Sequence, residues 1–247
     1  MLVATPSYGV LHTLAGSGRI TTLQVPFRGG MLDVEVWRIR GEEGLEHIVL
    51  HHALFGEQGP GRIYFTEDGD RPFATDANKF AFFCIAAACW IRSLEQAPDV
   101  VHLHDWHAAF YLPVTHYLQE FESLRRIRTV FTIHNLAYQG TRPLHGDESS
   151  LAAWYPGMIA DTRQIADPEH AHCINPMAAA IRLADRVSTV SPTYAREICR
   201  PSEPGNGFIG GEGLESLLLE ARASNRLTGV LNGCFYDDLR GRRPGWQ

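Results

Sequence analysis

Hydrophobic and polar positions along the first quarter of the chain follow the patterns that β-strands require. Residues 24–27 and 32–39 alternate apolar and polar side chains, and Arg28–Gly29–Gly30 lies between them. This arrangement predicts two strands joined by a glycine turn. Short apolar runs at 47–52 and 62–65 predict two further strands.

A long apolar segment comes next. Residues 76–95 predict one helix, with Asp76 as its N-cap. Within that helix, residues 80–91 carry no charge, but a run of about a dozen residues is too short to span a bilayer. The segment therefore predicts a helix buried in the core, and no membrane partner.

The remainder of the chain alternates between two patterns. Continuous apolar runs predict four buried strands, at 99–104, 128–134, 186–190 and 227–231. Helical patterns separate these strands, at 107–122, 176–184 and 212–223. A further helix is predicted to begin after residue 190, with Ser191 as its N-cap and Pro192 at position N1. Strands that alternate with helices of this length predict parallel βαβ units, and hence an α/β fold with a doubly wound, Rossmann-like parallel sheet.

Composition narrows the class of protein. The chain has 247 residues, of which 45% are hydrophobic and 20% are charged, as in a soluble protein with one sizeable domain or two small ones. A formal net charge of -6 argues against a nucleic-acid partner. The five cysteines form no C-x-x-C pair and Met1 opens no signal-peptide pattern, which together predict a reduced, cytoplasmic protein.

Polar residues follow each of the four predicted buried strands. They are His104–Asp105, His134–Asn135, Ser191–Pro192–Thr193 and Asn232–Gly233. Ligands of open α/β sheets bind beyond the carboxyl ends of the strands, so these residues predict one shared crevice. Each also has an ordinary structural explanation, since Ser191 can cap a helix and Asn232–Gly233 can form a turn.

Three histidines, His102, His104 and His107, raise the alternative of a metal site, as in a zinc hydrolase. His102 and His104 would face one side of a strand, whereas His107 follows a turn onto a helix. The sequence shows no distant Asp, Glu or His cluster to complete a ligand shell. We therefore expect no metal. The zinc hydrolase alternative would require stoichiometric zinc in the purified protein.

Four motifs appear in order along the chain: HDWHA (104–108) after PDVV, TIHNLAYQG (132–140), ADRVSTVSPTYA (184–195) and LNG (231–233). Together they closely resemble the N-terminal catalytic domain of bacterial glycogen synthases and plant starch synthases, which use ADP-glucose. The resemblance implies the GT-B architecture, in which two Rossmann-like domains face each other across a cleft. The N-terminal domain mainly handles the acceptor, and the C-terminal domain mainly the nucleotide sugar.

The implied reaction moves glucose from ADP-glucose to the non-reducing end of an α-1,4-glucan, with retention at the anomeric carbon and no cofactor or essential metal. By resemblance, His134 lies beside the transferred glucose, where an imidazole can hydrogen-bond a sugar hydroxyl and stabilise developing charge. Asp105 matches a carboxylate near the cleft that favours the same cationic character or orients an acceptor hydroxyl. His134 and Asp105 are the expected catalytic residues.

The resemblance also implies four substrate-binding residues. Trp106 and His107 match acceptor-side residues, and the indole would offer a flat apolar face to a sugar ring. Asn135 and Asn232 would supply amide hydrogen bonds on the donor side. Tyr138 and Gln139 are expected to shape the loop behind His134.

The chain also departs from the family pattern. The family begins with a strand followed by Lys-x-Gly-Gly-Leu, whereas Met1 to Tyr8 resembles the strand after that element, and the single lysine, Lys79, lies in an apolar helix. Residues 1–247 are therefore expected to form one acceptor-side domain without its first βα unit and without the nucleotide-sugar domain. We expect such a chain to be inactive or nearly so unless a partner supplies the donor side. The alternative is a non-catalytic glucan-binding or regulatory module derived from the same enzyme.

Overall fold

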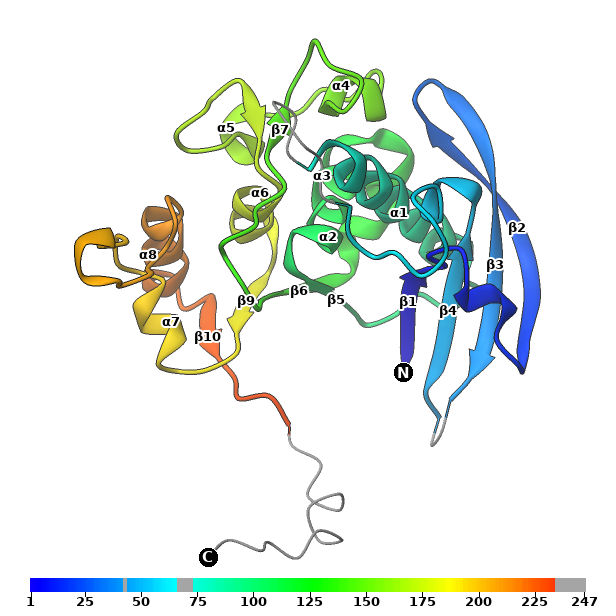
Figure 1. Ribbon diagram of the computed structural model, residues 1–247, viewed down its shortest axis with the longest axis horizontal. Coiled ribbons are helices and arrows are strands. Elements are labelled where there is room, and N and C mark those ends of the chain that lie inside the picture. The colour runs from blue at the N-terminus through cyan, green and yellow to red at the C-terminus, as the bar shows by residue number, and fades with distance from the viewer. Residues whose placement is uncertain (42–43, 66–72, 234–247) are drawn as a thin grey trace, which may run out of the picture.

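The computed structural model describes residues 1–41, 44–65 and 73–233, and arranges them as two four-stranded sheets, one two-stranded sheet and a layer of helices (Figure 1). The strands are β1 (Leu2–Pro6), β2 (Ser17–Phe27), β3 (Gly30–Arg40), β4 (Glu46–His51), β5 (Val100–His104), β6 (Arg128–Ile133), β7 (Arg142–Pro143), β8 (Cys173–Ile174), β9 (Arg186–Thr189) and β10 (Leu227–Gly229). The helices are α1 (Ala74–Ser93), α2 (Asp105–Ala109), α3 (Tyr111–Tyr117), α4 (Leu151–Trp154), α5 (Thr162–Ile165), α6 (Pro176–Leu183), α7 (Tyr194–Glu197) and α8 (Glu215–Ala223). Short 3₁₀ helices occur at Leu11–Thr13, Ala53–Phe55, Gln119–Arg126 and Pro204–Asn206.

The first sheet has the strand order β1-β4-β3-β2. Strands β2 and β3 form a long antiparallel hairpin, and β1 runs parallel to β4. The turn of the hairpin places both Arg28 and Gly29 at positive φ, 54° and 76°, as in the mirror-image turns that match the twist of paired strands. The predicted hairpin is confirmed, and so is the strand predicted at 47–52. The strand predicted at 62–65 is wrong, because that segment is irregular.

The second sheet has the order β10-β9-β6-β5, and all of its strands are parallel. This confirms the central sequence prediction of parallel βαβ units. Helix α2 contacts β5 and β6, α8 contacts β10, and α6 packs between α2 and α8. These helices cover one face of the sheet, where Leu103, Phe131 and Val187 are buried.

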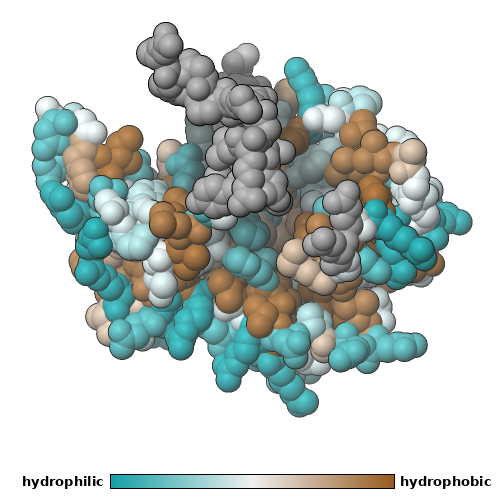
Figure 2. Space-filling view, turned by 90° about the horizontal axis from the view of Figure 1, so that it is seen from below, coloured by the Kyte–Doolittle hydropathy of each residue, from teal (hydrophilic) through white to brown (hydrophobic). Residues whose placement is uncertain are grey.

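The opposite face of the second sheet carries His102, His104 and Ser188, and within the described part of the chain it stays partly open. Strand β5 is therefore not the buried strand that its apolar sequence predicts, and Val100 is 49% exposed. Strand β10 is not a buried strand either, because none of its residues is fully buried. The free edges of β1 and β5 both line one groove of about 160 Å³, which is bounded by apolar side chains of α1. Seen from below, hydrophobic residues form separate patches among hydrophilic ones (Figure 2).

Helix α1 forms the centre of the core, as its apolar sequence predicts. Most of its residues are buried all round the helix, from Ala74 to Ile91. Asp76 is not its N-cap, because the helix begins at Ala74 and the Asp76 carboxylate bonds the Lys79 ammonium at 2.7 Å. The single lysine is thus held in a buried ion pair with the carboxylate of Asp76.

The helix predicted over 107–122 is divided into α2, α3 and a 3₁₀ helix. Pro113 has no N–H and its ring would clash with the carbonyl of Ala109 if one helix ran through both residues. A break at Phe110 instead places Pro113 in the first turn of α3, where proline is tolerated. The helix predicted from Ser191 begins later, at Tyr194, but Oγ of Ser191 accepts the N–H of Tyr194 at 2.9 Å, as a cap does. The helix predicted at 212–223 begins at Glu215.

Two further findings bear on the class of protein. None of the helices in residues 1–41, 44–65 and 73–233 has the length and apolar character needed to cross a membrane. The cysteines at 84, 89, 173 and 199 are free thiols, and Cys234 lies outside the described residues.

Candidate active site

The carboxyl ends of β5 and β6 lie side by side and carry the first candidate residues. The register pairs His104 with Thr132, so the chain leaves β5 at Asp105 beside the loop that begins at His134. Because the two strands run in the same direction, the residues that follow them meet at one edge of the sheet. The predicted convergence of these two strand ends is confirmed.

Asp105 holds the backbone of that loop. It has a φ of 53°, a left-handed conformation that short polar residues tolerate better than most. Its Oδ1 accepts the backbone N–H of His134 at 2.8 Å and that of Asn135 at 3.3 Å. A carboxylate bonded to two backbone N–H groups is a strong, charge-assisted anchor. The expected catalytic carboxylate thus has a clear structural task, which is to fix the start of the His134 loop.

The side chain of His134 is held by a second residue at the end of β5. Its Nε2 lies 3.0 Å from Nδ1 of His104, and the two ring centroids are 5.2 Å apart. Partial burial, and then the neighbouring imidazoles of His102 and His134, lower the pKa of His104 to about 4. His104 is therefore neutral near pH 7, and one of the two facing nitrogens must donate while the other accepts.

A second polar row crosses the same face of the sheet. Nε2 of His102 lies 2.6 Å from Oγ1 of Thr132, which in turn lies 2.6 Å from Oγ of Ser188. Burial, and then the neighbouring imidazole of His134, lower the pKa of His102. The three side chains come from β5, β6 and β9, so they link three neighbouring strands on the face that the helices leave open.

The positions of the three histidines argue against the alternative of a zinc site. His102 and His104 share one face, with ring centroids 4.2 Å apart, but the His107 ring packs 4.6 Å from that of Phe80. Within the described ranges, no three His, Cys, Asp or Glu side chains are grouped in a way that could hold a metal ion. His102 and His104 therefore lie together on one face of the sheet, whereas His107 packs against the core.

Trp106 and His107 point into the core from α2. The indole of Trp106 is 3% exposed and stands edge-on to Phe80 at 5.2 Å. It also covers Gly140, where an added Cβ would lie 2.2 Å from the indole Cε3. Burial lowers the pKa of His107 to about 4. The expected flat indole face for a sugar is therefore not presented in this structure, because the loop at Gly140 already covers it.

The two asparagines occupy exposed positions. Oδ1 of Asn135 accepts the N–H of Ala137 at 2.9 Å and stabilises the turn after His134. Asn232 follows β10, which lies two strands away from β6 in the sheet. With strands about 5 Å apart, the two strand ends are on the order of 10 Å from each other. Asn135 therefore adjoins His134, and Asn232 belongs to the far end of the same edge.

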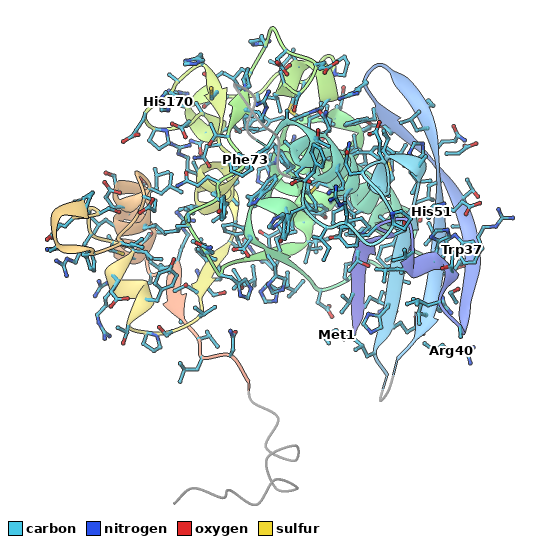
Figure 3. The ribbon with its side chains drawn as sticks, viewed as in Figure 1. Met1, Trp37, Arg40, His51, Phe73 and His170 are labelled. Atoms are coloured by element: carbon cyan, nitrogen blue, oxygen red, sulfur yellow. The ribbon has the colours of Figure 1, made fainter. Side chains whose placement is uncertain are left out.

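A pocket of about 390 Å³ lies beside the 137–141 segment of the loop. Phe73 and His170, both labelled in Figure 3, line it together with the carboxylates of Asp167, Glu169 and Glu212. Carboxylates next to an aromatic ring suit a ligand with many hydroxyl groups, since the oxygens accept hydrogen bonds and the ring packs on apolar C–H surface.

Gln139 and Asn175 fix the far end of the loop. Nε2 of Gln139 donates to the carbonyl of Glu212 at 2.9 Å, and its Oε1 accepts from Nδ2 of Asn175 at 2.6 Å. Asn175 also donates to Asp167 at 2.8 Å and caps α6 through Ala178. The loop-shaping role expected of Gln139 is confirmed. Sequence reasoning missed Asn175, although Asn175–Pro176 is a helix-start signal.

The comparisons with known proteins agree on one family. The family model described as the starch synthase catalytic domain matches residues 1–220. Glycogen synthase 2 of Geobacter sulfurreducens is 37% identical over 179 residues, which is 71% of this chain and 33% of that protein. A glycogen synthase of Deinococcus radiodurans is 39% identical over 196 residues, 79% of this chain and 37% of that protein.

A solved structure supports the same relationship. The catalytic domain of starch synthase IV from Arabidopsis thaliana, bound to ADP and acarbose, superposes with a TM-score of 0.71 at 29% identity, covering 90% of this chain and 42% of that one. The likeness confirms the GT-B class of fold expected from the sequence. The chain spans about a third of the length of these curated relatives.

Proposed function

Because this chain belongs to the starch synthase catalytic domain family of glycosyltransferases, we propose that it forms the acceptor-side wall of a glucosyl-transfer site. The reaction transfers glucose from ADP-glucose to the non-reducing end of an α-1,4-glucan, with retention at the anomeric carbon. The match over residues 1–220 carries the proposal, and the positioned His134 loop supports it.

His134 is the residue closest to the chemistry in this proposal. Its Nε2 is engaged by His104, and its Nδ1 has no hydrogen-bond partner within the described residues. That nitrogen can bond a hydroxyl of the transferred glucose as positive charge develops on the sugar ring. Asp105 keeps His134 in place through the backbone, and its negative charge favours the same cationic character.

Substrate contacts extend along the edge of the sheet. The side-chain amides of Asn135 and Asn232 are exposed and can bond the donor side, and the pocket beside residues 137–141 is suited to glucan hydroxyls. Trp106 supports this wall from beneath, because it packs under the loop that contains Gly140, and the ring of His107 lies against the indole. We propose that the diphosphate of the donor is bound by a second domain, since Lys79 is buried against Asp76.

The experiment mixes the purified 247-residue chain with radiolabelled ADP-glucose and glycogen. One mixture contains the chain alone, and the other adds the part of the Deinococcus radiodurans glycogen synthase that lies outside the matched region. We expect incorporation above background only in the second mixture. His134→Ala should abolish it, whereas His145→Ala, a change of an exposed histidine, should not.

Two results would count against catalysis. Background incorporation in both mixtures, with a folded chain, contradicts the proposal. If the chain nevertheless co-sediments with glycogen, the non-catalytic glucan-binding alternative is the better account.

A further inference from the structure

The end of β5 contacts His134 through two consecutive residues with different targets. Asp105 accepts hydrogen bonds from the backbone at His134, whereas His104 meets the imidazole ring at 3.0 Å. A distance of 3.0 Å between two ring nitrogens is that of a direct hydrogen bond. Backbone and ring of one residue are thus fixed separately by neighbours in the sequence.

The position of His104 is itself restrained. Its ring packs against that of His102, with centroids 4.2 Å apart, and His102 is anchored by Thr132 at 2.6 Å. Among the described residues, the titratable groups that face His104 are His102 on the same strand and His134 after the neighbouring strand β6. Because charge on either neighbour disfavours charge on His104, the ring stays neutral and keeps one donor and one acceptor nitrogen.

We propose that His104 is a positioning residue that holds the His134 ring so that Nδ1, and not Nε2, faces the substrate. A neutral imidazole carries its proton on one of its two nitrogens, and a hydrogen-bond partner on one nitrogen decides which of the two is protonated. Only the consequence for glucosyl transfer rests on the proposed function. The ring pairing is a property of the chain alone.

The test uses the full chain labelled with ¹⁵N at histidine, and NMR spectra that distinguish protonated from bare ring nitrogens. His104→Phe keeps an aromatic ring but removes Nδ1. His104→Asn and His104→Gln form a matched pair, because the asparagine amide occupies the region of Nδ1 and the glutamine amide the region of Nε2. We expect one His134 tautomer in the wild type and in His104→Asn, and a mixture in the other two variants.

An unchanged His134 spectrum in both His104→Phe and His104→Gln would overturn the proposal. If one variant fails to fold, as judged by its thermal transition, the other still decides, since the two differ from the wild type in different ways. A mixture of tautomers in His104→Asn equal to that in His104→Gln would also count against the assigned role of Nδ1.

The glucosyl-transfer mixture described above tests the consequence. We expect His104→Phe to lower kcat by about tenfold or more with little change in KM for glucan, and His104→Asn to recover most of it, because misplacement of a reacting group costs mainly rate. Wild-type transfer at background together with the expected NMR result would reject the proposed function and leave the ring pairing intact.

Discussion

Gly140→Ala tests whether the indole of Trp106 fixes the loop that carries His134. Gly140 has a φ of 68°, and an added Cβ would lie 2.2 Å from Cε3 and 2.7 Å from Cδ2 of the buried Trp106 ring. The left-handed backbone costs alanine about 1–2 kcal/mol. Overpacking a filled core adds about 1–3 kcal/mol, so the total loss of stability should be about 2–5 kcal/mol.

Gly146→Ala is the matched control. Gly146 has a φ of 81°, but no atom lies within 4 Å of the position of its added Cβ. The control therefore carries the backbone cost without the clash. The difference between the two variants isolates the contact with Trp106 and should be about 1–3 kcal/mol, or about 2–12 °C in Tm for a chain of this size.

Urea unfolding followed by tryptophan fluorescence and by circular dichroism measures both variants. Replacing the indole by Trp106→Leu in the Gly140→Ala background should reduce the penalty of Gly140→Ala to that of the control. Equal stability of Gly140→Ala and Gly146→Ala would refute the argument, because it would mean that the indole does not occupy the space beside Gly140.

Two further predictions concern carboxylates that accept backbone hydrogen bonds. Asp105→Ala should destabilise the chain by about 1–3 kcal/mol and speed hydrogen exchange of the two loop amides that donate to Asp105. Asp105→Asn should cost less stability, because it keeps one acceptor oxygen. Unchanged exchange of these amides in Asp105→Ala would contradict this. Burial alone would raise the pKa of Asp185, but hydrogen bonds from Thr129 and Arg128 lower it overall. A lowered folded-state pKa stabilises the chain above the unfolded pKa near 4 and loses that effect as the pH falls further, so the urea midpoint should drop less between pH 5 and 3 in Asp185→Asn than in the wild type.

Much of the fold follows from local pattern. The sequence predicts the hairpin at Arg28–Gly29, the buried helix α1 and the parallel strands after residue 99. It can do so because apolar periodicity and glycine turns set the backbone conformation over only a few residues. The motif from 132 to 140 identifies the loop that carries His134. The sequence alone therefore determined the fold class, the family and the part of the chain that contains the candidate site.

Which side chains face that site was decided by tertiary contacts. The sequence suggested Trp106 as a sugar platform, yet its indole is covered by Gly140, a residue 34 positions later. The sequence placed His104 at the predicted crevice but did not show that its ring pairs with His134, which follows the neighbouring strand β6. A residue's hydrophobic pattern fixes its local backbone, but its orientation and exposure depend on which distant segment packs beside it, and only the tertiary structure sets that.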